Sequence, residues 1–389
     1  MMLTVRRNIL LTPGPATTTD SVKLAQVVPD ICPREQEFGR LMESVCTDLT
    51  HIVADSGSYS AVVFGGSGTS AVESILSSVV HAGDLLLIVN NGAYGRRMCE
   101  MAEAYDLDSI VFHSPPHVAL DLTALESTLR SSRRKITHLA VVHHETTTGL
   151  LNDIAAIGEL CRRESVCLIV DAISSFAAIP IDMRQMGIQY LAASSNKNVQ
   201  GIPGLSIVVA ETELLENKRQ HKPRNYYLNL YDQYRFFLET RQSRFTPPVQ
   251  ALYALRQAID ELKREGIEQR YLRYQKSWQT LIDGITRLGL PYIGSDRLHS
   301  KLVTSIFEPE APGYSFQEMH DYLHSRGFTI YPGKLDQFRT FRIANIGDIT
   351  SDDMQSFLNL LEAYLRQIGF IPGALKGVIA SNTRSSEAK

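Results

Sequence analysis

The sequence contains few cysteines. Only five of its 389 residues are cysteine, and none of them forms a CxxC pair. This scarcity argues against a disulfide framework and against a cysteine-based zinc site. We therefore expect reduced thiols and a cytoplasmic location.

Long apolar runs and blocks of like charge are also missing. No stretch reaches the roughly 18 apolar residues of a membrane-spanning helix, and the run before Pro13 is too short for a signal peptide. The formal net charge is −3. We expect neither membrane insertion nor nucleic-acid binding. His143 and His144 have no suitably spaced third ligand, so no metal site is expected.

What the sequence does contain is an alternation of apolar runs and helix-like stretches between about residues 60 and 210. The runs are β-branched and bounded by breakers, as strands buried on both faces of a sheet are. This alternation predicts an α/β fold with helices on both faces of a mostly parallel sheet. The apolar runs lie at 59–64, 85–89, 109–112, 137–142, 167–170, 190–194 and 205–210, and the helical stretches at 68–80, 93–105, 121–130 and 153–163.

The pattern changes after residue 210. Pro247 and Pro248 precede a long amphipathic helix, as prolines at a helix start do. The remaining segments predict a smaller α+β region. They are a helix at about 267–288, a strand at 301–307, a helix at 315–326, short strands near 328–331 and 340–344, and a helix at 351–368.

Residues suited to chemistry follow several of these strands, at the sheet edge where open α/β sheets bind ligands. In FGGSGTSAVES (64–74), two glycines turn and a helix starts near Thr69. Backbone N–H groups and the hydroxyls of Ser67 and Thr69 can bind a phosphate there. The segment is neither a Walker A loop nor a GxGxxG loop. Taken alone, it is equally well explained as a flexible turn.

An acid and a lysine end two neighbouring strands. Asp171 closes CLIVD, and Lys197 lies in SSNKNVQGIPG. The carboxylate can hold a protonated pyridine nitrogen, although capping of the next turn is the simpler alternative. The lysine can be a nucleophilic amine, although most lysines are merely exposed. The pairing of D-x-x-S-S with N-K favours the chemical interpretation.

Three further segments supply candidates. Tyr94 in NNGAYGRR can stack on an aromatic cofactor, or it is an ordinary half-buried tyrosine. In HHETTTG, Thr146 or Thr147 can bond a cofactor ring oxygen. Arg342 in FRIANIG lies between apolar residues, which is more typical of a clamp for carboxylate or phosphonate than of a surface charge.

Together these segments resemble the class V aminotransferases of pyridoxal-phosphate (PLP) fold type I, and most closely the 2-aminoethylphosphonate–pyruvate aminotransferases. The similar segments run from LLTPGP to FRIANIG and include H-x-E-T-T-T-G-x-L-N, VDA-x-SSF and S-x-NK-x-x-QG-x-PG. The resemblance implies a large PLP-binding domain (16–265) with a mostly parallel seven-stranded sheet. It implies a small α+β domain (1–15 and 266–370), and residues 371–389 are expected to be a disordered tail.

The resemblance also implies roles for the candidates. Lys197 corresponds to the lysine that forms a Schiff base with PLP, and Asp171 to the partner of its ring nitrogen. Arg342 corresponds to the arginine that binds the substrate's acid group. The implied protein is a homodimer with shared active sites. The other implied cofactor contacts are Ser67, Gly68, Thr69, Tyr94, Thr146 and, from the neighbouring subunit, Thr246.

The implied reaction interconverts 2-aminoethylphosphonate and phosphonoacetaldehyde with a pyruvate/alanine-type pair. One segment departs from the family: DICPREQEFG (30–39) replaces a Trp-Asp-acidic run and makes Arg34 a further candidate for binding the phosphonate. This difference leaves the direction open, biosynthesis included.

Alternatives on the same scaffold are alanine–glyoxylate or serine–pyruvate transamination, a PLP lyase or desulfurase, and a non-enzymatic PLP-binding protein. A desulfurase needs a reactive cysteine on a mobile loop, and no cysteine follows Cys167. The Asp171–Lys197 pair argues against a non-enzymatic protein.

Overall fold

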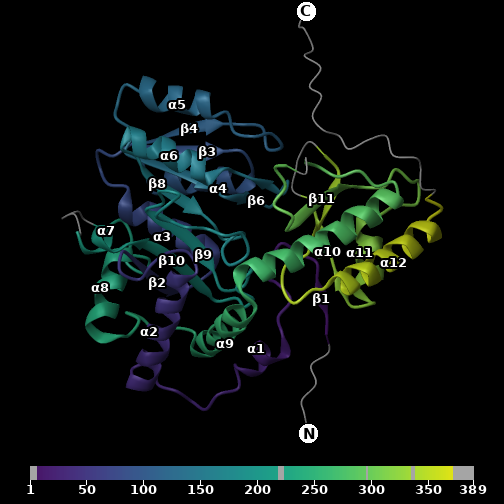
Figure 1. The fold of residues 1–389 in the computed structure, drawn as a ribbon, viewed down its shortest axis with the longest axis horizontal. Coiled ribbons are helices and arrows are strands. Elements are labelled where there is room, and N and C mark those ends of the chain that lie inside the picture. The colour runs from purple at the N-terminus through teal and green to yellow at the C-terminus, as the bar shows by residue number, and fades with distance from the viewer. Residues whose placement is uncertain (1–6, 218–222, 295–296, 334–337, 371–389) are drawn as a thin grey trace, which may run out of the picture.

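The computed structural model describes residues 7–217, 223–294, 297–333 and 338–370. Its largest feature is a seven-stranded sheet made of β2 (Tyr59–Gly65), β3 (Leu86–Asn90), β4 (Ser109–His113), β5 (His138–Val142), β8 (Cys167–Asp171), β9 (Tyr190–Ser194) and β10 (Leu205–Glu211). The strand order is β2-β10-β9-β8-β5-β3-β4 (Figure 1). Strand β10 is antiparallel to both neighbours, and the other four neighbouring pairs are parallel.

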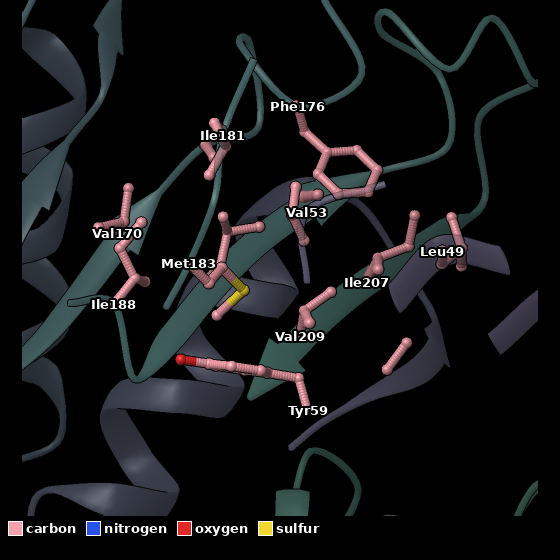
Figure 2. Close-up of a cluster of buried hydrophobic side chains, with 14 of the residues drawn as sticks. Leu49, Val53, Tyr59, Val170, Phe176, Ile181, Met183, Ile188, Ile207 and Val209 are labelled. Carbon is pink, nitrogen blue, oxygen red and sulfur yellow. The ribbon is translucent and has the colours of Figure 1, made fainter. Parts of the chain in front are cut away.

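Helices cover both faces of this sheet, which explains why its strands are apolar throughout. One core lies between the sheet and α1 (Asp20–Leu24), α2 (Gln36–His51), α5 (Leu122–Ser131), α6 (Ile154–Glu164) and α9 (Val249–Glu265). Figure 2 shows part of it, where Met183 and Phe176 lie beside side chains of β2, β8 and β10. The other core includes side chains of α3 (Gly68–Val79), α4 (Ala93–Ala104), α7 (Thr212–Glu216) and α8 (Leu230–Thr240).

A second, smaller assembly follows in the chain. The antiparallel sheet of β11 (Val303–Phe307), β14 (Thr340–Ala344) and β13 (Tyr331–Pro332), in that order, packs with three helices around its own apolar core. The N-terminal strand joins it, because β1 (Ile9–Leu10) pairs in parallel with β12 (Phe328–Thr329). The remaining elements are α10 (Ile267–Arg287), α11 (Phe316–His324) and α12 (Ser351–Gln367).

The sheet topology gathers the predicted site residues at one edge. Strands β3, β5, β8 and β9 are mutually parallel, so their carboxyl ends lie on the same side. Beyond β5 a short hairpin forms between β6 (His144–Glu145) and β7 (Leu150–Leu151). This hairpin reaches the smaller assembly, since the Leu151 N–H donates to the Leu298 carbonyl at 2.8 Å.

The seven predicted strands and the mostly parallel sheet are confirmed. Two helices that flank the sheet, α2 and α8, were not among the predicted elements. The predicted disordered tail, 371–389, lies outside the described residues. Within the described part of the chain, no helix combines the length and the apolar character that crossing a bilayer requires.

Candidate active site

Lys197 lies just beyond the end of β9, next to the strand that ends in Asp171. Strands β8 and β9 are parallel, with Asp171 opposite Ala192. The Lys197 Nζ donates a hydrogen bond to the Pro13 carbonyl at 2.6 Å. A Cβ on Gly14 would overlap the end of the Lys197 side chain. The amine therefore lies against the N-terminal segment at Gly14, whose φ of +132° itself favours glycine.

Asp171 is a buried carboxyl group. Its Oδ1 accepts a hydrogen bond from the Ile173 N–H at 3.0 Å. Burial raises the pKa of Asp171 to about 6, against the opposing effects of that hydrogen bond and of the charges of Arg97 and Lys197. A cation placed against this carboxyl would hold it ionised, as a protonated pyridine nitrogen does.

The glycine loop after β2 leads directly into α3. Ser67 is the N-cap of this helix, and its side chain makes no capping hydrogen bond. Gly68 packs against Ile173, because a Cβ there would lie 2.9 Å from the Ile173 Cδ1. The helix start is therefore close to the segment that follows Asp171. With Ser67, Gly68 and Thr69 at its first turn, it offers N–H groups to an anion.

Tyr94 opens α4, and a buried glutamate fixes its backbone. The N–H groups of Tyr94 and Gly95 both donate to the Glu145 Oε1, at 3.0 and 3.1 Å. The guanidinium of Arg97 lies over the Tyr94 ring, with its Cζ 5.0 Å from the ring centroid. Glu145 thus fixes the backbone of Tyr94, and the Arg97 guanidinium packs on its ring.

The two threonine candidates after β5, Thr146 and Thr147, differ in their hydrogen bonds. The Thr147 hydroxyl donates to the Glu145 Oε2 at 3.0 Å. The Thr146 hydroxyl is buried and has no hydrogen-bond partner among the described residues. A buried hydroxyl of this kind is suited to a ligand oxygen, so Thr146 is favoured over Thr147 for that contact.

His144 is part of the structure around the site and is fully bonded. Its Nδ1 faces the Ser174 carbonyl at 3.3 Å, so this nitrogen carries the proton, and its Nε2 accepts from the Ser300 hydroxyl at 2.7 Å. Burial lowers the pKa of His144 to about 3. The neutral ring therefore joins the segment after Asp171 to the smaller assembly.

Arg342 lies in β14 and is almost completely buried. Its Nε donates to the Pro332 carbonyl at 3.0 Å. Burial lowers its pKa, while nearby Tyr94 and Tyr331 raise it. The Tyr94 side chain is thus within reach of the guanidinium. Arg342, from the smaller assembly, therefore lies close to Tyr94 in the first turn of α4.

Arg34 has a different environment. Its guanidinium donates to the Ser243 carbonyl at 2.6 Å and to the Gln242 Oε1 at 3.1 Å. None of its described contacts is with Lys197 or Asp171. Its role toward a phosphonate stays a prediction.

Thr246 follows that same segment and is exposed. Two residues later, the Pro248 ring lies next to the glycine loop, 3.3 Å from where a Cβ on Gly65 would be. Thr246 is therefore on the surface near the start of α3, and its contact with a cofactor phosphate stays a prediction.

Two residues of this region were missed from the sequence. Glu145 was not predicted, because only the threonines of HHETTTG were considered as ligand contacts. A glutamate in a buried polar run is nevertheless unusual, and this was a usable signal. Arg97 was overlooked because an arginine in a helix is usually exposed. Its position three residues after Tyr94 places both on one helix face, which was the available signal.

The comparisons with known proteins agree with this geometry. The family model for class-V aminotransferases matches residues 24–334. The chain belongs to the class-V aminotransferases. This aminotransferase is 38% identical over 362 residues to a 2-aminoethylphosphonate–pyruvate transaminase of Salmonella heidelberg, covering 92% of this chain and 98% of the relative.

Solved structures show the same fold over almost the whole aminotransferase chain. An alanine–glyoxylate aminotransferase from Nostoc sp. is 26% identical, covers 94% of this chain and 97% of its own, and superposes with a TM-score of 0.85. A ureidoglycine–glyoxylate aminotransferase from Bacillus subtilis is 22% identical, with coverages of 96% and 97% and the same TM-score of 0.85. The predicted fold type I is confirmed, as is a PLP-dependent transaminase.

The residues of the site fit PLP. The cofactor has an aldehyde, a ring nitrogen, a ring hydroxyl and a phosphate. The chain offers a lysine amine, a buried carboxyl and the unpaired Thr146 hydroxyl for the first three. For the phosphate it offers the α3 start, whose N-cap side chain makes no capping bond.

Proposed function

We propose that this aminotransferase transfers the amino group between 2-aminoethylphosphonate and pyruvate, with phosphonoacetaldehyde and alanine as the other pair. The observation that carries the proposal is the 38% identity, over 98% of their length, to transaminases that bear this name. The site supports it, because both substrates carry acid groups and Arg342 is a buried guanidinium beside Tyr94. A guanidinium binds carboxylate and phosphonate groups by paired hydrogen bonds.

Residue roles follow from the positions of the side chains. PLP, when bound, supplies a carbonyl for the amino group and a ring that withdraws electrons. Lys197 would hold the cofactor through its Nζ, and the released amine would serve as the base that takes the substrate's proton and gives it back. Asp171 would hold the proton on the ring nitrogen, and Arg342 would orient the substrate's acid group.

The cofactor contacts belong to the same proposal. Ser67, Gly68 and Thr69 hold the phosphate at the start of α3, and Tyr94 lies on the ring. Thr146 bonds the ring oxygen, supported by its unpaired buried hydroxyl. Arg34, whose guanidinium bonds Gln242 and Ser243, is assigned to the phosphonate because it is the added cation of the DICPREQEFG segment.

The assembly and domain organisation are proposals as well. We infer a homodimer in which Thr246 reaches the partner's cofactor, supported by its exposed position directly after Phe245, whose ring contacts exposed Tyr226 and Tyr227. The domain division at 15/16 and 265/266 is supported by the pairing of β1 with β12 and by separate apolar cores. A cytoplasmic location is supported by the five free cysteines.

A half-reaction screen tests the substrate. The PLP-loaded protein is mixed in turn with 2-aminoethylphosphonate, alanine and serine, and the loss of the cofactor's visible absorbance is followed. Pyruvate and glyoxylate are then compared as acceptors, and the reaction is run in both directions. We expect the fastest conversion with 2-aminoethylphosphonate and pyruvate. Faster reaction of alanine with glyoxylate, or of serine with pyruvate, would overturn the proposed substrate.

Variant K197A provides the matched control for the chemistry. We expect it to lose the covalent absorbance band and to lose turnover with every amine, because alanine has no amine to form a Schiff base with the cofactor aldehyde. A K197A protein that keeps both the band and the turnover would refute the role of Lys197. Failure of the substrate proposal alone would leave this result intact.

Alanine–glyoxylate transamination is the second candidate. It is favoured by the structural likeness to the Nostoc enzyme, at 26% identity and a TM-score of 0.85. The screen separates it from the first candidate by the response to the phosphonate amine.

A further inference from the structure

A cluster of charged side chains around buried Arg270 lies behind the turn that carries Lys197. Arg270, in the first turn of α10, is only 1% exposed. Its Nε donates to the Glu265 Oε2 at 2.7 Å. The same carboxylate receives the Arg273 Nε on its other oxygen, also at 2.7 Å. One glutamate thus pairs two arginines, which compensates for the removal of these charges from water.

The second edge of the Arg270 guanidinium bonds the lysine turn itself. Its Nη1 donates to the Asn198 carbonyl at 2.6 Å and lies 3.4 Å from the Val199 carbonyl. The turn is compact, because the Gln200 N–H donates to the Lys197 carbonyl at 3.0 Å and Gln200 has a φ of +67°. Both carbonyls belong to buried residues, where an unpaired acceptor is costly. Arg270 therefore fixes the backbone directly after Lys197.

The same helix also holds the segment that follows Arg342. The Arg273 Nη1 donates to the carbonyls of Gly347 and Ile349, at 2.8 and 3.1 Å. The Tyr274 hydroxyl receives the Gln200 side-chain amide at 2.7 Å and the Gly347 N–H at 3.0 Å. Adjacent residues of α10 are thus bonded both to the Lys197 turn and to the chain three residues beyond β14.

We propose that Arg270, paired with Glu265, is a positioning residue that sets Lys197 relative to Arg342. It acts through the backbone of the lysine turn and does not touch substrate. The planar fork of a guanidinium can bond a carboxylate on one edge and carbonyls on the other, whereas a lysine ammonium is a single point charge. This assignment rests on the proposed function in one respect, namely that Lys197 and Arg342 act on the same substrate.

The test is the charge-conserving variant R270K, studied as the PLP-loaded enzyme. Misplacement of a reacting group by about 1 Å costs on the order of 100-fold in rate. We expect kcat per bound cofactor to fall about 10- to 100-fold, with the KM for the amino donor within about threefold of wild type. We also expect the pH midpoint of the bound cofactor's visible absorbance to shift by about half a unit or more. Because the charge is kept, such a shift reports geometry.

Two further variants complete the design. R264K is the matched control, since Arg264 is an exposed arginine of the neighbouring α9 that, among the described residues, bonds only its own helix, at the Asp260 carbonyl. It should leave kcat and the absorbance midpoint unchanged. Y274F removes the hydroxyl between Gln200 and Gly347, and should change both readouts in the direction of R270K by a smaller amount. It keeps the test open if R270K does not fold.

The outcomes are distinct. An R270K enzyme with unchanged kcat and unchanged absorbance midpoint overturns the proposal, even if its melting temperature falls, because Arg270 would then only stabilise the fold. A rise in KM alone overturns it as well. If the wild type prefers another amine, the proposed substrate fails. The comparison of R270K with wild type is then made with that amine.

Discussion

Glu145 shows how one buried side chain shapes this site. It caps α4 through the N–H groups of Tyr94 and Gly95, and it accepts the Thr147 hydroxyl on its other oxygen. A Cβ on Gly92 would lie 2.2 Å from its Oε2, so the approach to α4 must be a glycine. Burial outweighs these bonds and raises the pKa of Glu145 to about 7.

This pKa makes the stability of the cofactor-free protein depend on pH. Between the ordinary pKa of 4.5 and the folded-state pKa of about 7, the folded protein keeps a proton that the unfolded chain has lost. The contribution of Glu145 is therefore most favourable below pH 4.5 and declines as the pH rises to about 7. Relative to E145Q, which has no charge to bury, the wild type should lose on the order of 3 kcal/mol over this range.

Urea unfolding of both proteins at several pH values from 4.5 to 8 measures this difference. T147V is the control, since it removes a hydrogen-bond donor but keeps the carboxyl, and it should retain at least the wild-type pH dependence. Unfolding free energies of wild type and E145Q that stay parallel across the range would contradict the assignment. His143, His144 and Asp171 titrate in both proteins, so the difference reports Glu145 together with its electrostatic coupling to Asp171.

At the residue scale, sequence reasoning succeeded where a strand end restricts a side chain. Asp171 ends one apolar run and Lys197 comes three residues after the end of the next, so their places at the sheet edge could be predicted from the positions of these runs. Glu145 and Arg270 could not be predicted in this way. Their partners are backbone groups 50 and 72 residues away in sequence, and hydrogen bonds to main-chain groups leave no pattern in side-chain identities.

Helix α12 is the element whose end is best defined. The Thr350 side chain accepts from the Asp353 N–H at 3.2 Å, and the Asp353 Oδ2 accepts from the Thr350 N–H at 2.9 Å, which is a capping box. Arg7 donates to the Asp353 Oδ1 at 2.6 Å and ties the N-terminal segment to the cap. The cap thus joins two ends of the chain that meet in the smaller assembly.

Variant T350A should therefore destabilise the protein by about 1 kcal/mol, the usual cost of losing an N-cap side chain. Chemical denaturation measures the loss, and turnover of the loaded enzyme should stay at the wild-type level. S356A, at an exposed position on the same helix, should change stability by less than about 0.5 kcal/mol. Equal losses of stability in T350A and S356A would show that the Thr350 side chain does not stabilise the start of α12.

Most elements with a clear apolar period were predicted, although α2, which buries Phe38, Met42, Val45 and Leu49 on one face, was missed. The strands are continuous apolar runs, and α12 has one apolar face. Helix α8 instead buries polar Gln233 among Tyr231 and Tyr234. Its Gln233 amide donates to the Val63 carbonyl of β2 at 3.2 Å, so tertiary contacts, more than sequence pattern, define this helix.

At the scale of the whole molecule, two exposed tyrosines contact Phe245, the residue before Thr246. Tyr226 is 74% exposed and Tyr227 is 43% exposed. The Phe245 ring stacks on Tyr227 with centroids 5.2 Å apart, and the Arg244 guanidinium lies over Phe245 at 5.0 Å. Exposed aromatic and arginine side chains are enriched at protein interfaces. This surface supports the inferred dimer, in which Thr246 serves the partner's site.

Mixed dimers of two damaged chains can test whether Thr246 acts across the interface. K197A and T246V are co-expressed with different affinity tags, and dimers carrying both tags are purified. If Thr246 serves the partner, one site of each mixed dimer carries both lesions and the other carries none, so about half of the sites are intact. At limiting PLP, the mixed dimers should then reach about half of the wild-type activity, far above either parent. If Thr246 instead serves its own chain, every site carries one lesion, and the activity stays at the average of the two parents. That result would remove the support for shared active sites, because the exposed threonine would then have to turn inward to the α3 start of its own chain.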